Sequence, residues 1–572
     1  MFGKKTEAPT TQYDNSLYKD LVVYQIWCRS FLDKNGDGIG DLEGVLDKLD
    51  YIQSLGCNAI WFSPIYPSPQ ADYGYDIADY KNINPEYGDL ELFKKVLDEA
   101  HSRGMKIIMD LVVNHTSDEC EWFKESMKST DNPYHDYYFW RKGRTDENGK
   151  KLPPNNWLSI FEGGAWEYNK ELDEYYLHIF AKKQPDLNHD NPKVREEVSS
   201  IMKFWLDMGV DGFREDVITY ISKRPGLPSG FPLPVATGVE HYNQGPNLMK
   251  YLQEYRHTVV DNYSAVQIAD SPMTGPKDAI RYTTGKDKVF DMLISFDHMA
   301  ADCILTDTIH LPFSLRKMKK AFSKWQTTLQ GKAWNSLYIE NHDHPRIISR
   351  YGNEDFWKES GKALAVACYM QRGTPFVYQG QEIGMLNIHL DDINEFKDVV
   401  TFNNQKIFKK FGVPDKVYLK IANLTSRENS RTPVQWDESA NAGFTTGTPW
   451  FKVNPNYKDR KINVADEEND PDSILNFYRK LFSVRQADKL YIYGDYKEYY
   501  PKSRKLYCYE RSYKGRKALV MVSFSTKDQT FNAPEGFDLT KGELVLCNYD
   551  DASATADSCT LRPYEARVYY YG

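Results

Sequence analysis

The sequence predicts an α/β protein: a (β/α)8 TIM barrel with an inserted loop-rich subdomain after its third strand and a C-terminal antiparallel β-sandwich domain. From residue 20 to about 490, short β-rich runs alternate with amphipathic helical segments, and eight of these runs are strand candidates. After about residue 490 the pattern holds strands only. A chain of 572 residues is also too long for one ordinary core, which favours one large domain with smaller attachments.

The alternation begins with strand, helix, strand, helix and strand in direct succession. The apolar residues of segment 90–104 recur at helical spacing and fall on one face. Gly56, Gly104 and Gly209 stand between a helical pattern and a strand, where a left-handed residue would end the helix. The predicted barrel strands lie within residues 21–27, 57–66, 105–115, 210–218, 264–270, 292–299, 334–343 and 374–384, and predicted helices within 45–56, 90–104, 194–209, 315–329 and 361–373.

The alternation pauses once, and that pause sets the domain boundaries. After His115, about seventy residues are rich in Trp, Tyr, Asn, Pro and Gly before helical periodicity resumes. We therefore expect the barrel, domain A, to comprise residues 1–115 and 186–490, with an inserted domain B at 116–185. Residues 491–572 form the predicted all-β domain C, with strands within 505–513, 518–525, 542–550 and 565–571.

Composition excludes several classes of partner. A net charge of −9 and a pI near 5.8 argue against nucleic acid, because no basic face offsets the acidic balance. No apolar run approaches membrane-spanning length, and residues 1–12 have no signal-peptide pattern. The eight cysteines are scattered without a C-x-x-C pair, so reduced thiols are expected. The sequence thus predicts a soluble cytoplasmic protein that does not bind membranes.

Polar residues follow four of the predicted strands at their carboxyl ends. In a (β/α)8 barrel the active site lies at that face, so these side chains are expected to meet in one pocket, although any one of them could instead cap a helix. They are Asp110, Asn114 and His115 on the third strand, Arg214 and Asp216 on the fourth, Asp270 on the fifth, and His342 and Asp343 on the seventh.

Two carboxylates on adjacent strands match the needs of glycosidic bond cleavage. One carboxylate attacks or stabilises the anomeric carbon, and the other protonates the leaving oxygen. Arg214 would keep Asp216 ionised as the nucleophile by favourable charge interaction. Asp343 and the histidines would hold sugar hydroxyls and stabilise the positive charge of the transition state.

Seven short motifs carry a resemblance to a known family. The sequence resembles the α-amylase superfamily, glycoside hydrolase family 13, and within it the oligo-1,6-glucosidase and α-glucosidase group. The resemblance covers nearly the whole chain, from about residue 18. The motifs, in order, are "ADYGYDI" (71–77), "DLVVNH" (110–115), "QPDLN" (184–188), "GFREDV" (212–217), "IADSP" (268–272), "ENHDHPR" (340–346) and "SRENSRTPVQWD" (426–437).

The resemblance implies a role for each matching residue. It makes Asp216 the nucleophile and Asp343 the third carboxylate, which stabilises the transition state. "QPDLN" and Val217 are similar to family members that prefer α-1,6 bonds, so isomaltose and short isomalto-oligosaccharides are the implied substrates. The residues implied to bind the nonreducing-end glucose are Asp72, Tyr75 as a stacking platform, His115, Arg214, His342 and an arginine that is either Arg427 or Arg431.

Asp270 departs from the family pattern, which has glutamate as the general acid at this position. Aspartate is one methylene shorter, which withdraws the carboxyl by roughly 1 to 1.5 Å. Three interpretations follow: a working but weakened acid, an inactivating substitution that leaves a sugar-binding protein, or another carboxylate that supplies the proton. For the third, the candidates are Glu382 and Glu215, although strand alternation should point Glu215 away from the pocket into a buried ion pair.

The stretch "DKNGDGIGD", residues 33–41, has oxygen-bearing side chains at regular spacing, with glycines that allow a tight turn. It lacks the glutamate at the twelfth position of an EF-hand, and a solvated turn is the alternative. The resemblance implies a structural Ca²⁺, or Mg²⁺, in this loop and no organic cofactor. The implied ligands are Asp33, Asn35, Asp37, the Ile39 carbonyl and Asp41.

Four functions compete on this scaffold. The first is a retaining exo-α-1,6-glucosidase, expected to be a monomer that acts on small oligosaccharides. The second is a sucrose isomerase or trehalose-forming mutase on the same scaffold. The sucrose isomerases of the family carry an arginine-rich loop after the sixth strand, whereas the matching stretch here, "FDHMAADC" (296–303), has no arginine, which favours hydrolysis. The third is a non-enzymatic sugar-binding protein, which depends on Asp270. The fourth, a transporter-associated heavy chain, requires an N-terminal membrane span that the sequence does not show.

Overall fold

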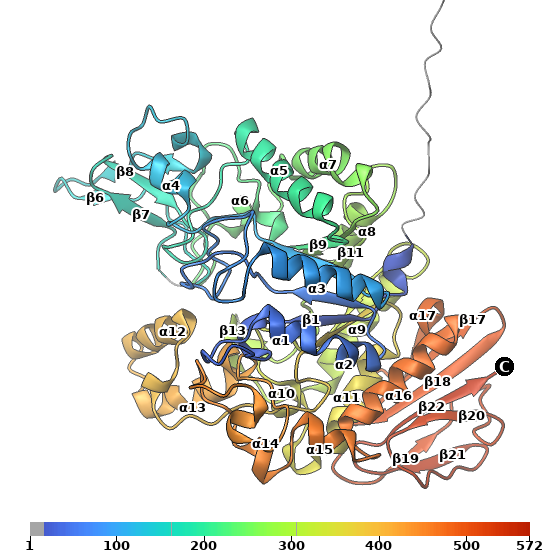
Figure 1. The fold of residues 1–572 in the computed structure, drawn as a ribbon. Coiled ribbons are helices and arrows are strands. Elements are labelled where there is room, and N and C mark those ends of the chain that lie inside the picture. The colour runs from blue at the N-terminus through green and yellow to red at the C-terminus, as the bar shows by residue number, and fades with distance from the viewer. Residues whose placement is uncertain (1–15, 162, 305) are drawn as a thin grey trace, which may run out of the picture.

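A computed structural model describes residues 16–161, 163–304 and 306–572. Eight parallel strands form its central barrel (Figure 1), in the order β11-β10-β9-β3-β2-β1-β15-β14. A parallel bridge between Leu293 and Asn335 joins the two ends of this order and closes the sheet. All eight predicted barrel strands are confirmed. Their bounds are β1 Val23–Ile26, β2 Ala59–Phe62, β3 Lys106–Leu111, β9 Gly212–Glu215, β10 Val266–Asp270, β11 Met292–Ile294, β14 Ser336–Leu337 and β15 Thr374–Tyr378.

Helices surround the barrel where helical periodicity predicts them, with one difference. The helix predicted at 45–56 is two helices, separated at Lys48 with φ −110° and ψ 9°. Gly56, Gly104 and Gly209 have φ of 84°, 74° and 113°, the left-handed conformation predicted for helix ends. The principal helices are α1 Leu42–Asp47, α2 Leu49–Ser54, α3 Leu90–Ser102, α5 Pro192–Met208, α7 Leu248–Thr258, α8 Pro276–Thr283, α9 Leu315–Leu329, α10 Ile347–Tyr351, α11 Trp357–Tyr369, α12 Val399–Lys410, α13 Asp415–Thr425 and α16 Ile474–Ala487.

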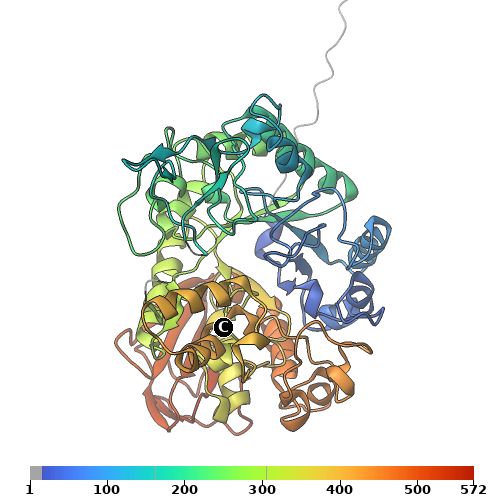
Figure 2. The same ribbon diagram turned by 90° about the vertical axis from the view of Figure 1, so that its left-hand side faces the viewer.

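The segment between β3 and α5 forms small antiparallel sheets over an aromatic core. Phe123, Tyr138 and Trp140 pack together there, with ring centroids 4.9 and 5.7 Å from Phe123. In Figure 1 this segment and helices α12 and α13 lie at the same side of the barrel, which Figure 2 shows facing the viewer. One sheet has three strands, in the order β4-β8-β7, and the other has two, β5 and β6. Their bounds are β4 Trp140–Arg141, β5 Arg144–Thr145, β6 Lys151–Leu152, β7 Trp166–Asn169 and β8 Glu174–Leu177.

The C-terminal residues form an antiparallel domain on the opposite side of the barrel in Figure 1. A five-stranded sheet, in the order β16-β17-β18-β22-β20, packs against the pair β19-β21. Leu519 and Met521 from the first sheet meet Phe531 and Leu561 from the second in one apolar cluster. The strands are β16 Asp495–Tyr499, β17 Leu506–Tyr513, β18 Arg516–Ser523, β19 Gln529–Asn532, β20 Glu543–Cys547, β21 Ser558–Leu561 and β22 Ala566–Tyr571.

Three sequence-based expectations concern membrane spans, a signal peptide and the cysteines. Among the described residues, the helices include none that is both long and apolar enough to span a bilayer. Residues 1–12, for which the sequence predicts no signal peptide, lie outside the described residues. All eight cysteines are free thiols, and six of them are buried.

Candidate active site

Arg214 stands at the centre of the predicted pocket and holds three carboxylates. Parallel register places Asp110 of β3 opposite Arg214 of β9. The buried guanidinium lies 2.8 Å from Asp110 Oδ1 and 2.6 Å from Asp216 Oδ1 through Nη1, and its Nη2 pairs with Asp270 Oδ2. Three predicted residues, Arg214, Asp216 and Asp270, are therefore brought together with Asp110 at the carboxyl ends of three adjacent strands.

The shared guanidinium only partly offsets the effect of burial on these acids. Burial raises the pKa of Asp110 to about 7 and that of Asp216 to about 6, while Arg214 lowers both. Burial also raises the pKa of Asp270, and the negative charge of Asp343 adds to this rise. One positive charge among three carboxylates favours retention of a proton in the cluster.

Asp343 faces the other side of the pocket, with 39% of its side chain exposed. His342 Nε2, Arg431 Nη2 and Arg427 Nη1 lie 3.1, 3.0 and 3.3 Å from its carboxyl oxygens. Desolvation opposes ionisation, but these three groups hold the pKa of Asp343 well below its ordinary value. Asp343 is thus an ionised carboxylate that remains open to a ligand.

Arg427 links Asp343 to the other predicted glucose-binding residues. Its Nη2 lies 2.6 Å from Asp72 Oδ1. The side chain of Arg427 is 12% exposed and that of Arg431 is 1% exposed. Arg431 also donates from Nε to the His342 carbonyl at 2.8 Å. Both arginines of the motif therefore belong to the site, with Arg427 nearer its opening.

Aromatic and histidine side chains form one wall of the pocket. Tyr75 stacks on His342, with ring centroids 5.2 Å apart and planes 6° apart. His115 Nε2 lies 3.1 Å from the Tyr75 carbonyl. Burial lowers the pKa of His115, and burial lowers that of His342 to about 4 despite the attraction of Asp343. Both imidazoles are therefore neutral at neutral pH.

Two glutamines orient these histidines, and sequence reasoning did not assign them a role. The Gln25 amide lies 2.9 Å from His342 Nδ1, which must accept because an amide nitrogen only donates. His342 then carries its proton on Nε2, which faces Asp343. Gln184 Nε2 lies 3.1 Å from both Asp72 Oδ2 and His115 Nε2. Gln184 is the first residue of the motif "QPDLN", the only signal that could have found it.

Asp398 is a further acid that the sequence analysis missed. It is fully buried and pairs with Arg427 Nε and, at 3.3 Å, with Arg431 Nη1. These arginines lower the pKa of Asp398 despite its desolvation. It lies in a loop before α12 that holds several acidic residues, and no pattern distinguishes it from them.

The second oxygen of Asp270 has an unusual environment. Oδ1 is buried and meets no hydrogen-bond partner among the described residues. Beside it lies a small cavity lined by Trp61, Phe296 and Tyr338, together with the barrel residues Gln25, Arg214, Ile294, Glu340, Asn341 and Phe376. A cavity of about 10 Å³ thus adjoins the Asp270 carboxyl within the barrel mouth.

The two alternative proton donors occupy other environments. Glu382 accepts hydrogen bonds from the Tyr24 and Tyr51 hydroxyls, at 2.7 and 2.8 Å, and is fully buried. Burial raises the pKa of Glu215 to about 8, with Arg256 lowering it. The prediction of a Glu215 ion pair is wrong within the described residues: no cationic nitrogen lies within ion-pair distance, because Arg256 acts only at longer range.

The predicted metal loop is closed by its own backbone amides. Asp33 accepts from the amides of Gly36 and Gly38, both at 2.7 Å. Asp41 Oδ2 accepts from Lys34 and Asn35, and the exposed Asp37 accepts from Ile39 at 2.8 Å. These oxygens suit a hard cation such as Ca²⁺, so the residues present fit the ion. The loop remains a predicted metal site.

A different group of potential metal ligands occurs elsewhere. Asp302, Cys303 and His310 bring their ligand atoms within 4.8 Å of one another, which the sequence did not indicate. Arg350 pairs with both oxygens of Asp302, at 2.8 and 3.0 Å. A guanidinium in this position opposes a second cation, so this group is not a candidate metal centre.

Comparison with known proteins identifies the class. A family model for the alpha amylase catalytic domain matches residues 25–494. An oligo-1,6-glucosidase of Parageobacillus thermoglucosidasius is 47% identical, over 96% of this chain and 98% of that protein. A trehalose-6-phosphate hydrolase of Bacillus subtilis is 42% identical, over 96% and 98%. The crystal structure of the trehalulose synthase from Pseudomonas mesoacidophila MX-45 has a TM-score of 0.91 at 40% identity, covering 99% of this chain and 100% of that one.

The matches extend over nearly the full chain and include the barrel and the C-terminal domain. The chain therefore belongs to the α-amylase family, glycoside hydrolase family 13, and is a glycoside hydrolase of the oligo-1,6-glucosidase type.

Proposed function

We propose that this protein is a retaining, exo-acting α-glucosidase that hydrolyses α-1,6 bonds at the nonreducing ends of isomaltose and short isomalto-oligosaccharides. The observation that carries this proposal is the pairing of Asp216 and Asp270 with one guanidinium, that of Arg214. Retaining enzymes need two carboxyl groups only about 5 to 5.5 Å apart, and a shared guanidinium keeps two carboxyls close. Several relatives named oligo-1,6-glucosidase support the linkage.

In the proposed mechanism, Asp216 attacks the anomeric carbon while Asp270 donates a proton to the leaving oxygen. Asp270, now ionised, then removes a proton from water, which displaces Asp216. Asp343 stabilises the positive charge that develops on the sugar ring. Asp72, Arg427 and His342 bind glucose hydroxyls, and Tyr75 stacks on the sugar.

The preference for α-1,6 bonds is assigned to the residue after the nucleophile. Val217 is buried and has φ 38° and ψ 36°, a conformation that is strained for a β-branched side chain. The surrounding packing therefore holds the backbone in this conformation directly beside Asp216. We infer that the Val217 side chain shapes the space next to the scissile bond.

A structural cation belongs to the same proposal. Asp33, Asn35, Asp37, the Ile39 carbonyl and Asp41 would hold Ca²⁺, or Mg²⁺, and stiffen the loop after β1. The loop packs against the segment 444–450, where Asp33 accepts a hydrogen bond from Thr445 Oγ1 at 2.5 Å. The ion would stabilise this contact and take no part in bond cleavage.

One observation favours a second candidate, a sugar-binding variant with a disabled acid. Asp270 is one methylene shorter than the glutamate of the family pattern, and its Oδ2 is held by Arg214, so in this candidate its carboxyl does not reach the glycosidic oxygen. A transglycosylase on the same scaffold would need the same acid. In this second candidate Asp216 would still react with activated substrates, whereas natural disaccharides would be bound and not cleaved.

The proposal is tested with purified protein on isomaltose, maltose and para-nitrophenyl α-glucoside at equal concentrations. We expect faster cleavage of isomaltose than of maltose, first release of the α-anomer by NMR, and loss of activity on all three in Asp216→Asn. Faster cleavage of maltose would refute the α-1,6 assignment, and first release of the β-anomer would refute retention. Reaction of the aryl substrate alone would favour the sugar-binding variant.

A further inference from the structure

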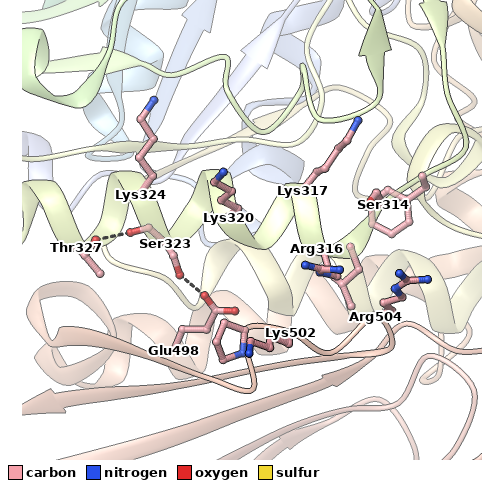
Figure 3. Close-up of a pocket in the computed structure, with 13 residues that line it drawn as sticks. Ser314, Arg316, Lys317, Lys320, Ser323, Lys324, Thr327, Glu498, Lys502 and Arg504 are labelled. Carbon is pink, nitrogen blue, oxygen red and sulfur yellow. Dashed lines mark hydrogen bonds between the residues drawn. The ribbon is translucent and has the colours of Figure 1, made fainter.

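A groove of about 950 Å³ lies between helix α9 and the C-terminal domain (Figure 3). Residues 313–327 line one side, and residues 498–504, from β16 and its connection to β17, line the other. The lining residues include none of the predicted catalytic, glucose-binding or metal-binding residues. The volume is within the range of small-molecule sites. The groove is therefore a second candidate site, separate from the barrel mouth.

The groove is strongly basic although the chain has a net charge of −9. Lys324 is paired with Asp297 at 2.7 Å. The one acid of the lining, Glu498, is occupied by buried Lys319 at 3.5 Å and by Ser323. The other five cations are exposed and have no ion-pair partner among the described residues: Arg316, Lys317, Lys320, Lys502 and Arg504.

Three of the positive groups lie together between the two walls, whereas the labelled lysines of α9 extend from the other side of the helix in Figure 3. Figure 3 shows Arg316, Lys502 and Arg504 in the space between α9 and the strands of the C-terminal domain. Arg316 and Lys320 are four residues apart and therefore neighbours on the helix surface. Like charges brought together in a concave surface raise the local potential and attract a counter-ion. The arrangement is complementary to a ligand with several negative charges.

The two walls of the groove are fixed relative to each other. Lys319 donates from Nζ to the carbonyls of Tyr500 and Leu506, at 2.8 and 3.0 Å, across the boundary between α9 and the C-terminal domain. Phe313, Leu315 and Pro501 add apolar surface to the lining. The groove thus exists before a ligand binds, which reduces the entropy cost of binding.

We propose that this groove binds a small molecule that carries a chain of two or more phosphate groups. Guanidinium groups form bidentate hydrogen bonds with phosphate oxygens. Arg316 and Arg504 supply two guanidinium groups from opposite walls of the groove. A single phosphate would leave part of the positive charge of Arg316, Lys502 and Arg504 unneutralised. A long polyanion is disfavoured because the rest of the chain is acidic. The ligand is either an inorganic phosphate chain or a nucleoside triphosphate.

The test is calorimetric titration of the full chain at low ionic strength with tripolyphosphate and, separately, with ATP. Arg316→Gln/Arg504→Gln removes one charge from each wall. The matched control is Lys94→Gln/Lys95→Gln, which removes two exposed charges from α3. We expect one-to-one binding that the groove variant weakens at least tenfold and the control leaves unchanged. Should the groove variant have a lower thermal midpoint, the single Lys502→Gln on the exposed connection replaces it.

The two ligands distinguish the sources. Tighter binding of ATP than of tripolyphosphate would identify a nucleotide, with the base on the apolar surface, and equal binding would identify the phosphate chain alone; both support the site. Absence of binding at millimolar ligand, or equal weakening in the control variant, would overturn the proposal. Because the readout is binding, this result is independent of whether isomaltose is hydrolysed.

Discussion

Replacing Asp270 by glutamate tests the proposed acid most directly. The change adds one methylene, which advances the carboxyl by roughly 1 to 1.5 Å. A misplacement of about 1 Å can reduce a rate on the order of 10²-fold. A cavity of about 10 Å³, lined by Trp61, Phe296 and Tyr338, adjoins the carboxyl that the longer side chain would advance. We therefore expect Asp270→Glu to raise kcat/KM for isomaltose about 10²-fold, equivalent to about 2.7 kcal/mol of transition-state stabilisation.

The assay compares isomaltose with para-nitrophenyl α-glucoside for the unchanged protein, Asp270→Glu and Asp270→Asn. The aryl leaving group needs little protonation, so its glycosylation step should change less than about threefold in Asp270→Glu. Asp270→Asn is the control that keeps the side-chain size and removes the acid. A gain of less than tenfold on isomaltose in Asp270→Glu, together with loss of isomaltose cleavage in Asp270→Asn, would refute the misplacement argument and show that the aspartate is a competent acid.

Three further predictions concern pH, metal and stability. Because Asp216, as the proposed nucleophile, would have to be ionised and its pKa is raised to about 6, kcat/KM for the aryl substrate should fall as pH drops below 6; a flat profile between pH 5 and 7 would contradict this. EDTA should lower the thermal midpoint and added Ca²⁺ should restore it, whereas an unchanged midpoint with no metal detected by elemental analysis would exclude the cation. Lys223→Met should cost about 3 to 5 kcal/mol in urea unfolding, since it leaves the fully buried Asp186 without its partner at 2.6 Å; a cost under about 1 kcal/mol would count against a buried ion pair.

Sequence reasoning located the barrel and most of the site because strand ends in this fold meet at one face. Once β3, β9 and β10 are assigned, register places Asp110 and Ile268 on either side of Arg214, and Asp270 follows two residues after Ile268 at the strand end. Local pattern could not locate the break at Lys48, because Val45, Leu49 and Ile52 are buried on both sides of it and keep helical spacing throughout.

Sequence patterns could not identify residues that join the site through contacts distant in sequence. Asp398 joins the site only because its loop folds back onto Arg427 and Arg431, and no spacing rule encodes that contact. The wrong prediction of a Glu215 ion pair has the same cause, because such a pair also depends on contacts distant in sequence. Strand alternation predicts a Glu215 side chain directed away from the pocket, but whether Arg256 comes within bonding distance depends on the packing of α7.

The hydrogen-bond donors around the three carboxylates of Arg214 influence whether the proposed acid, Asp270, carries a proton. Asp110 receives hydrogen bonds from Trp61 Nε1 at 3.2 Å and the Tyr75 hydroxyl at 3.1 Å, in addition to Arg214. These donors favour its ionised form, against the burial that raises the pKa of Asp110 to about 7. Asp270 Oδ1 meets no donor among the described residues, so a proton there satisfies an otherwise unpaired buried oxygen. This effect acts in the same direction as burial, which raises the pKa of Asp270. In the proposed mechanism Asp270 needs that proton as the acid, and Asp216 must be ionised to attack.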